Sequence, residues 1–446
     1  DADKGFKVLQ GSELTITPIV DSFLETNYSW QINGEDISNE LTCTLPTIEL
    51  GEYQVRFATH NEDGDDEVTF KVEVCSPDQV DFNWTFLQTE YNMSAGRTIR
   101  IKPVDVNNAL DAVYTWTVDN EQVQSGENDT YLFTSEQQGE HTVKVEMKNS
   151  YILATQTLKV NVCPPAGTYQ RKISATSSAS MNKVYEYLPA PGQFINENHN
   201  TTTMAEACTY AEERINQTAY VSLGGFGGYI IVGFDHSIVN DGDYNIAITG
   251  NAFDGSSEPG IIWVMQDENG DGLPNDTWYE LRGSEYGKAE TWQDYAVTYH
   301  KPTGIQLPTP WTDNHGQSGS IDYLGAFHRQ DYYYPAWVKE KQYTLRGTRL
   351  KERNYDQSGN GTYWVNDSYE WGYADNFSAI DRLTDDDNYN AGPSDNHFKI
   401  SHAVTFDGKD ANLKYVDFIK VQVGVNSKSG WLGEISTEVF GIKDFN

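Results

Sequence analysis

The sequence predicts an all-β protein in which two small β-sandwiches in tandem precede a larger β-sandwich domain with one short helix. Three observations lead to this prediction. The 446-residue chain is rich in Gly, Tyr and Trp and has few long helical patterns. A sequence pattern repeats within the first 165 residues. Short alternating apolar runs bounded by turn residues recur through most of the chain.

The internal repeat defines two similar modules. Residues 28–30 (Tyr-Ser-Trp) match residues 114–116 (Tyr-Thr-Trp), and residues 72–75 (Val-Glu-Val-Cys) match residues 160–163 (Val-Asn-Val-Cys). The matches lie 86 and 88 residues apart, so one unit of about this size recurs with little insertion. With Ser76-Pro77 and Pro164-Pro165 as linkers, the sequence predicts domains at 1–77, 78–165 and 166–446.

The Tyr-x-Trp pattern places Trp30 and Trp116 inward on a central strand, where a sandwich needs bulk between its sheets. The paired Cys of antibody domains are missing, so packing is expected to hold each module together. The modules resemble the PKD-like and Ig-like domains of bacterial surface proteins. This resemblance implies that they act as spacers.

Four cysteines occur in the chain, at positions that argue against a disulfide framework. Cys75 and Cys163 end equivalent strands of the two modules, and Cys208 falls on a predicted helix. We expect buried thiols. A Cys43–Cys75 bridge in an oxidising compartment is the alternative.

The third region contains one clear helical pattern, over residues 203–216. Thr203 and Glu206 form a capping box, and Ala207, Cys208, Ala211 and Ile215 line one face. Residues 224–228 (Gly-Gly-Phe-Gly-Gly) predict a tight turn. Strands are expected at 219–223, 229–234, 244–249, 260–266, 295–300, 397–406 and 415–425, an order typical of a jelly-roll-like sandwich.

An acidic loop lies between apolar residues 261–265 and strand-like residues 278–281. Asp267, Asn269 and Asp271 alternate and Gly272 follows, as in the first half of a calcium loop. The twelfth position is Trp278 instead of Glu, which leaves Asp276 or Glu280 to complete the shell. We predict a structural calcium ion held by Asp267, Asn269, Asp271 and Asp276; an acidic hairpin without metal is the alternative.

Aromatic residues crowd between residues 323 and 377, among polar residues and chain-breaking Gly and Pro. Rings displayed on loops bind sugars by stacking or a flat macrocycle by shape. An ordinary aromatic core accounts for the same pattern equally well. The expected ligand-binding residues are Tyr332, Tyr333, Tyr334, Trp337, Trp364, Trp371, Tyr373 and His397.

Histidines of the third region are candidate ligands for a borderline metal, including a cobalt centre. For any single one of them, a hydrogen-bonded structural histidine is the favoured interpretation. His315 and His397 lie in the most loop-like settings. His397 and His402 approach a zinc-ligand spacing, but their odd separation on a strand puts them on opposite faces.

Charge and missing motifs exclude several functions. Thirty-one basic against 66 acidic residues give a net charge of −35, which argues against nucleic-acid binding. No stretch approaches the roughly twenty apolar residues of a membrane span. The sequence has no Gly-x-Ser-x-Gly elbow and no His-Glu-x-x-His motif. We therefore predict a protein that is not an enzyme.

The third region also carries a family resemblance, in residues 223–228, 257–261, the Asp267 loop with residues 278–281, and residues 429–435. It resembles Bacteroides-type surface lipoproteins that join PKD-like modules to a C-terminal globular domain. The resemblance implies a lipid anchor upstream of Asp1, a place on the outer-membrane surface, and capture of a corrinoid such as vitamin B12 for an outer-membrane transporter. A glycan-binding protein and a cell-adhesion protein are the alternatives.

Overall fold

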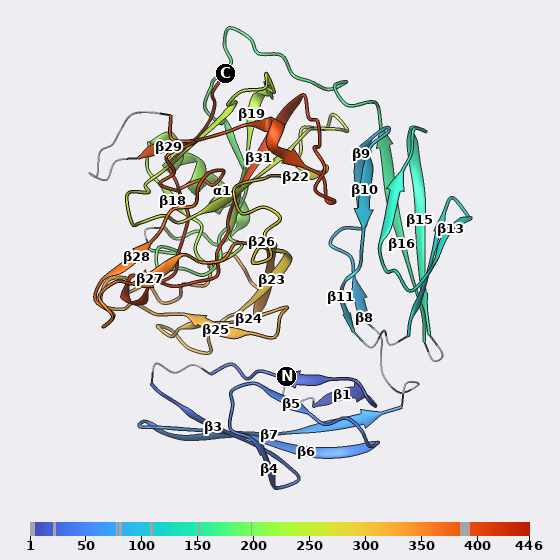
Figure 1. Ribbon diagram of the computed structural model, residues 1–446, viewed down its shortest axis with the longest axis vertical. Coiled ribbons are helices and arrows are strands. Elements are labelled where there is room, and N and C mark those ends of the chain that lie inside the picture. Colours follow the sequence, from blue (N-terminus) through green and yellow to red (C-terminus); the bar gives the residue numbers. More distant parts are fainter. Residues whose placement is uncertain are drawn as a thin grey trace. The chain divides into compact units, whose positions relative to one another are not determined.

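The computed structural model describes residues 5–20, 24–76, 79, 83–107, 109, 111–149, 152–197, 199–383 and 393–446. The chain forms two compact units, Asp1–Pro165 and Ala166–Asn446 (Figure 1). Strands make up nearly all the regular structure in these ranges, so the all-β class is confirmed. The expected limit between the first two modules, at residues 77 and 78, lies outside the described residues.

The first module has a five-stranded sheet in the order β1-β7-β6-β3-β4 and a two-stranded sheet β2-β5. Strands β1 and β7 run parallel, whereas the other pairs are antiparallel. The strands are β1 (Phe6–Leu9), β2 (Leu14–Ile16), β3 (Asn27–Ile32), β4 (Glu35–Ser38), β5 (Cys43–Leu45), β6 (Gly51–Asn61) and β7 (Gly64–Cys75).

The second module repeats this topology, with a five-stranded sheet β13-β12-β15-β16-β9 in which β9 runs parallel to β16. Two-stranded sheets β10-β14 and β11-β8 complete it. Its strands are β8 (Asn83–Thr85), β9 (Glu90–Ser94), β10 (Thr98–Ile101), β11 (Val104–Asn107), β12 (Val113–Val118), β13 (Glu121–Gly126), β14 (Tyr131–Thr134), β15 (Gly139–Lys148) and β16 (Leu153–Cys163).

Trp30 on β3 and Trp116 on β12 are both 0% exposed, which confirms that each fills the core of its module. Each is surrounded by the alternating apolar residues of the neighbouring strands. Cys43, Cys75 and Cys163 are buried, Cys208 is half-buried, and none of the four forms a disulfide. Packing therefore holds both modules together.

The C-terminal unit is built on a six-stranded sheet and several smaller sheets (Figure 1). The six-stranded sheet has the order β17 (Lys183–Leu188), β19 (Tyr229–Val239), β31 (Tyr415–Val423), β21 (Gly260–Met265), β22 (Trp278–Leu281) and β30 (Ala403–Val404). The four-stranded sheet has the order β25 (Ser318–Ile321), β24 (Thr309–Asp313), β23 (Trp292–His300) and β26 (Gln342–Arg349). The other sheets contain β29 (Ser394–Phe398), β20 (Ile246–Gly250) and β33 (Gly441–Asp444); β18 (Val221–Ser222) and β32 (Glu438–Val439); and β27 (Asn354–Asp356) and β28 (Trp364–Asn366).

The α-helix α1 spans Met204–Asn216. Thr203 is its N-cap, and the reciprocal hydrogen bonds with Glu206 make the predicted capping box. Ala207, Ala211 and Ile215 are buried in the main core of this unit, so the predicted apolar face is confirmed.

The expected strand at 397–406 is wrong in its middle. Strand β29 ends at Phe398, the 3-10 helix η3 spans Ile400–His402, and β30 follows. Asn245 Oδ1 accepts the Ile400 amide at 3.2 Å, and the His402 amide donates to the Lys399 carbonyl at 3.0 Å. These contacts satisfy backbone groups that a strand would have paired with a neighbour.

Candidate ligand-binding site

Four of the rings expected on a binding surface are buried. Tyr333 and Tyr334 are 1% exposed, Tyr373 2% and Trp337 6%. The expectation of an exposed aromatic platform is wrong for these four. Each polar tip bonds to the backbone: Tyr333 and Tyr334 donate to the carbonyls of His328 and Glu340, Trp337 donates to that of Tyr187, and Tyr373 accepts the Glu285 amide. Rings whose polar atoms are satisfied in this way can be buried at little cost.

Two further expected residues, Tyr332 and Trp364, are half-buried but lie outside the cavity described next. Lys301 Nζ lies 5.2 Å from the centre of the Tyr332 ring. Trp364 packs against Gly430, where a Cβ atom would come within 2.2 Å of the indole nitrogen. Both rings therefore have local packing partners.

Trp371 and His397, the remaining two, line one cavity of ≈ 220 Å³ in the C-terminal unit. The lining comes from the segment just before β20, from the end of β22 and the residue after it, from the loop between β28 and β29, and from β29 through η3. The complete lining is Tyr244, Leu281, Arg282, Trp371, Gly372, Ile380, Asp381, His397, Phe398, Lys399 and His402.

Asp381 organises one wall of this cavity. Its Oδ2 accepts the Gly372 amide at 2.6 Å and its Oδ1 accepts Asn396 Nδ2 at 2.9 Å. Its backbone carbonyl lies 2.9 Å from His397 Nδ1. Because a carbonyl can only accept, Nδ1 of His397 carries a proton and donates it to Asp381. Gly372, which follows Trp371 in the chain, is therefore held in place by the buried carboxylate of Asp381.

The second imidazole of the cavity is His402, whose ring centre lies 5.1 Å from that of Trp371. Burial lowers the pKa of His402, and the charges of Arg282 and Lys399 lower it further. His402 is therefore neutral at pH 7. The 3-10 helix corrects the expectation that His397 and His402 face opposite ways, because both line the same cavity.

The size and lining of the cavity limit what it can hold. An apolar cavity of about 150 Å³ is known to hold benzene, so ≈ 220 Å³ suits one ring-sized group and excludes a whole macrocycle. Aromatic and aliphatic walls favour a flat or apolar face on that group. Arg282 and Lys399 add positive charge, although they also pair with Asp410 and Asp243.

Sequence reasoning missed most of this lining. Tyr244, Arg282, Asp381 and Lys399 come from segments far apart in the chain and share no motif. Only the loop-like setting of His397, its spacing from His402 and the aromatic density around Trp371 marked the site in advance.

The acidic loop joins β21 to β22, which pair as an antiparallel hairpin as expected. Asp267 is buried and accepts the amides of Gly270 and Gly272, at 2.7 and 3.0 Å. Asn269 Oδ1 accepts the Asp271 amide at 2.9 Å. The alternating oxygens thus shape the turn themselves.

Asp276 closes the loop. Its Oδ2 accepts the Glu268 amide at 3.0 Å, while its Oδ1 is buried and has no hydrogen-bond partner among the described residues. Burial raises the pKa of Asp276 to about 8. Asp267, Asp271 and Asp276 do not form a group of ligand atoms within 4.8 Å of one another in the described chain. The loop carboxylates are therefore not gathered around one point, although the unpartnered Asp276 oxygen and the hard donors are of the kind that calcium prefers.

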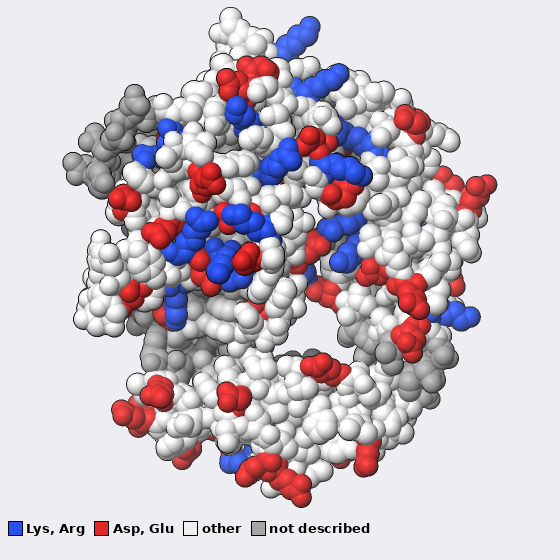
Figure 2. Space-filling view, in the orientation of Figure 1, with Lys and Arg blue, Asp and Glu red and all other residues white. Residues whose placement is uncertain are grey.

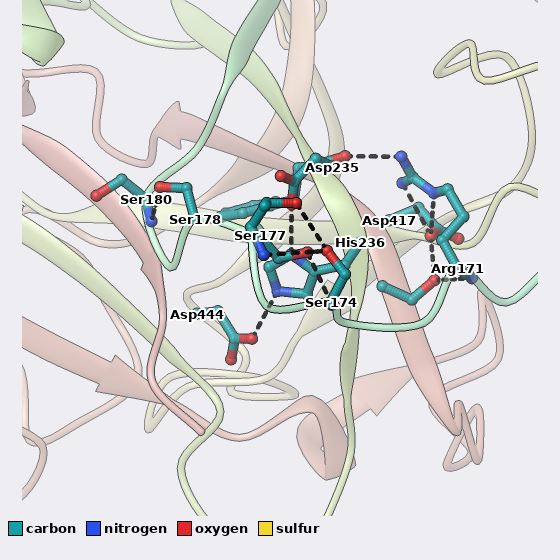
Figure 3. Close-up of polar contacts among 12 residues, drawn as sticks. Arg171, Ser174, Ser177, Ser178, Ser180, Asp235, His236, Asp417 and Asp444 are labelled. Atoms are coloured by element: carbon teal, nitrogen blue, oxygen red, sulfur yellow. Dashed lines mark hydrogen bonds and ion pairs between the residues drawn. The ribbon is translucent and has the colours of Figure 1, made fainter.

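His236 on β19 has both ring nitrogens engaged by carboxylates, as Figure 3 shows. Nδ1 lies 2.7 Å from Asp235 and Nε2 2.8 Å from Asp444 on β33. Beside it, Asp417 Oδ1 binds Arg171 Nη2 at 3.0 Å, and Asp417 Oδ2 accepts the Asp267 amide at 2.8 Å. This network anchors the last strand and the base of the acidic loop, and it leaves His236 without a lone pair for a metal.

Comparison with known proteins bears on the N-terminal unit. The family model described as "PKD-like domain" matches residues 1–61 and 86–149. The N-terminal unit contains PKD-like β-sandwich domains. Domains of this surface type are compatible with adhesion or binding. A search of curated proteins found no match to the chain.

Solved structures similar to parts of the chain contain tandem β-sandwiches. Fibronectin(III)-like modules of Clostridium thermocellum CbhA are 16% identical, with 38% of this chain and 95% of that one covered and a TM-score of 0.19. Titin domains Z1Z2 in complex with telethonin are 20% identical, covering 36% and 92%, with a TM-score of 0.18. At these scores the likeness carries no conclusion about function.

The surface of the chain is strongly acidic. Figure 2 shows Asp and Glu side chains across the face in view, with Lys and Arg interspersed among them. The net charge of −35 repels nucleic-acid backbones. None of the helices in the described ranges is long and apolar enough to cross a membrane.

Proposed function

We propose that this chain is a non-enzymatic cell-surface protein whose C-terminal unit captures a nutrient by taking one ring-sized group into the Trp371 cavity. The observation that carries the proposal is the convergence of Trp371, His397 and His402 on one cavity of ≈ 220 Å³. Trp371 offers a stacking face, and the rings of His397 and the neutral His402 offer nitrogens for a polar edge.

A corrinoid is the first ligand to test, because the family resemblance of the C-terminal region implies it. A corrinoid carries an appended heteroaromatic base that is close in size to the cavity, whereas its macrocycle is not. In this proposal the base or another side group enters and the macrocycle lies against the rim. A sugar ring is the alternative occupant, since Trp faces also stack on sugars.

The rest of the molecule supports capture at a cell surface. The PKD-like domains serve as spacers, an upstream lipid anchor holds the chain to the outer membrane, and an outer-membrane transporter receives the ligand. A calcium ion in the Asp267 loop braces the β21–β22 hairpin.

Isothermal titration calorimetry with cyanocobalamin, at micromolar protein, tests the proposal. We expect binding by the unmodified chain and about tenfold weaker binding by Trp371→Ala, since a ring contact contributes about 0.5–1.5 kcal/mol beyond its buried area. Trp431→Ala is the matched control, because Trp431 is 51% exposed and does not line the cavity.

Three results would redirect the proposal. The absence of heat with cyanocobalamin removes the corrinoid, and a glycan array then decides whether a sugar occupies the cavity. Equal affinities for both Trp variants place the binding site elsewhere. Binding to host matrix proteins without any small ligand favours adhesion.

A further inference from the structure

Three acidic side chains outside the cavity and outside the acidic loop converge in the C-terminal unit. Glu258, Asp375 and Glu438 each place one carboxylate oxygen within 4.8 Å of the other two. Asp375 is 1% and Glu438 4% exposed, and Glu258 is half-buried. Such a concentration of negative charge is costly in a low-dielectric interior unless something neutralises it.

The backbone holds the three residues together from segments far apart in the chain. Glu258 donates its amide to the Asp375 carbonyl at 2.9 Å, and Glu438 donates its amide to Asp375 Oδ2 at 2.9 Å. The Ser436 amide donates to Glu258 Oε1 at 3.3 Å. Asp375 adopts a left-handed backbone (φ 52°), which is uncommon for a residue with a side chain.

One oxygen of this cluster lacks a partner. The Glu438 carboxyl has side-chain contacts with Glu258 and Ser436, but its Oε1 is buried and accepts no hydrogen bond among the described residues. A carboxylate oxygen in that position ordinarily finds a donor, a water molecule or a cation. Glu438 is more than nine-tenths buried, and its carboxylate is part of the converging group.

The pKa values of the three carboxyl groups are raised, as expected for buried acids that lie close together. Burial raises the pKa of Glu258 to about 8, with the charge of Asp375 adding to the shift. Burial also raises the pKa of Asp375 to about 7, and burial with the charges of Glu258 and Asp375 raises that of Glu438. The three groups therefore repel one another when ionised.

We propose that Glu258, Asp375 and Glu438 form a second calcium site, buried in the C-terminal unit and separate from the Asp267 loop. All three ligands are hard carboxylate oxygens, which suit Ca²⁺ or Mg²⁺ better than Zn²⁺ or copper. The three oxygen atoms lie within 4.8 Å of one another, so one Ca²⁺ ion can contact all of them at about 2.3–2.6 Å. Ca²⁺ accepts irregular shells of protein oxygens, whereas Mg²⁺ usually keeps several waters, so calcium is the better match to a buried group.

The site would tie together three parts of the fold. Glu258 precedes β21, Asp375 lies in the loop between β28 and β29, and Glu438 begins β32. A bound ion would replace mutual repulsion by attraction to a common centre and so stabilise the unit. This role does not depend on the ligand of the Trp371 cavity.

The test uses the full chain carrying Asp271→Ala, so that the Asp267 loop does not contribute. The protein is treated with EDTA, exchanged into chelator-free buffer at pH 7.5 and titrated with calcium chloride by calorimetry and by thermal melting. We expect one calcium per chain and a rise in the melting temperature of the C-terminal unit of about 5 °C or more at a hundredfold excess over Kd.

Glu438→Gln, added to that background, keeps the shape of the side chain and removes one ligand charge. We expect calcium affinity to fall by about a hundredfold or more, while the metal-free melting temperature stays equal or rises because a buried charge is gone. Glu280→Gln is the matched control: Glu280 is 7% exposed and lies outside the group, so its calcium response should persist.

The proposal fails if the Asp271→Ala protein binds no calcium, or if Glu438→Gln binds it as tightly as its parent. In either case the three carboxyl groups share protons instead of an ion. If Glu438→Gln does not fold, Asp375→Asn decides by the same criterion, because Asn tolerates the left-handed backbone.

Discussion

Two tyrosines of the C-terminal unit show how differently the same side chain can be placed. Tyr334 donates to the Glu340 carbonyl and is 1% exposed, whereas Tyr363 is 60% exposed and stays at the surface. Both have the same chemistry and lie in the same aromatic-rich stretch. The difference arises from the neighbours that the fold supplies.

At the same scale, His236 links β19 to the last strand through Asp235 and Asp444. Burial alone lowers the pKa of His236, but the two carboxylates outweigh burial and the pKa is raised above its usual value. Its folded-state pKa therefore exceeds the unfolded value of about 6.5. The stability it contributes is fully present below about pH 6.5 and is lost as the pH rises through the folded pKa.

Asp444→Asn should expose this pH dependence. We expect it to lower the free energy of unfolding of the C-terminal unit by about 1.5–3 kcal/mol at pH 6, where it removes a charge-assisted hydrogen bond, and by less at pH 9. Urea unfolding at the two pH values measures the difference.

Glu352→Gln is the control for that experiment. Glu352 pairs with Arg349 at 2.6 Å, and an arginine keeps its charge over this range. Glu352→Gln should therefore lower the free energy of unfolding by the same amount at pH 6 and pH 9. An equal penalty for Asp444→Asn at both pH values would show that His236 does not titrate there.

At the scale of elements, the loop between β21 and β22 is shaped by its own side chains, with Asp267 accepting two backbone amides. The buried Asp276 Oδ1 is the atom that a cation would satisfy. The loop is therefore a turn formed by its own hydrogen bonds, and we propose that calcium satisfies the remaining Asp276 oxygen.

Calcium removal tests the loop between β21 and β22. The experiment uses the Glu438→Gln protein, in which the cluster of Glu258, Asp375 and Glu438 is expected to bind calcium weakly. We expect EDTA to lower the melting temperature of the C-terminal unit by a few degrees and Asp271→Ala to reproduce that loss, with no further effect of EDTA. Differential scanning calorimetry gives both values. An unchanged melting curve on chelation would mean that the loop binds no metal.

The 3-10 helix η3 has the largest consequence for the site among the short elements. It turns the chain after β29, so that His397 and His402 line one cavity. On a continuous strand the two side chains would point to opposite faces.

On the scale of the whole molecule, the described residues form separate hydrophobic cores. Each N-terminal module has one main core, and the largest core lies in the C-terminal unit; these three share no residue. Two smaller clusters lie beside them, one in the first module and one in the C-terminal unit. A substitution in one core should therefore leave the stability of the others unchanged.

Trp116→Ala tests that independence. The substitution should lower the free energy of unfolding of the second module by about 3–5 kcal/mol, since Trp116 is fully buried between its sheets. Calorimetry of the full chain should show an earlier transition for this module and an unshifted one for the C-terminal unit. A downward shift of every transition would mean that the chain unfolds as one cooperative block.

The sequence by itself determined the features that depend on residues close together in the chain. The tandem repeat, the buried Trp30 and Trp116, the Thr203–Glu206 capping box and the hairpin around the acidic loop were all predicted. Helix caps, turns and strand alternation are encoded within a few residues, so their patterns are visible without a fold.

The tertiary structure alone decided which side chains meet across long separations. The cavity gathers Tyr244, Arg282, Trp371 and His397, and the carboxylate cluster gathers Glu258, Asp375 and Glu438. No local pattern marks these sets, because strand order and loop paths bring their members together only when the sheets pair. The burial of Tyr333 and Trp337 was likewise fixed by distant backbone partners, which an amino-acid pattern does not reveal.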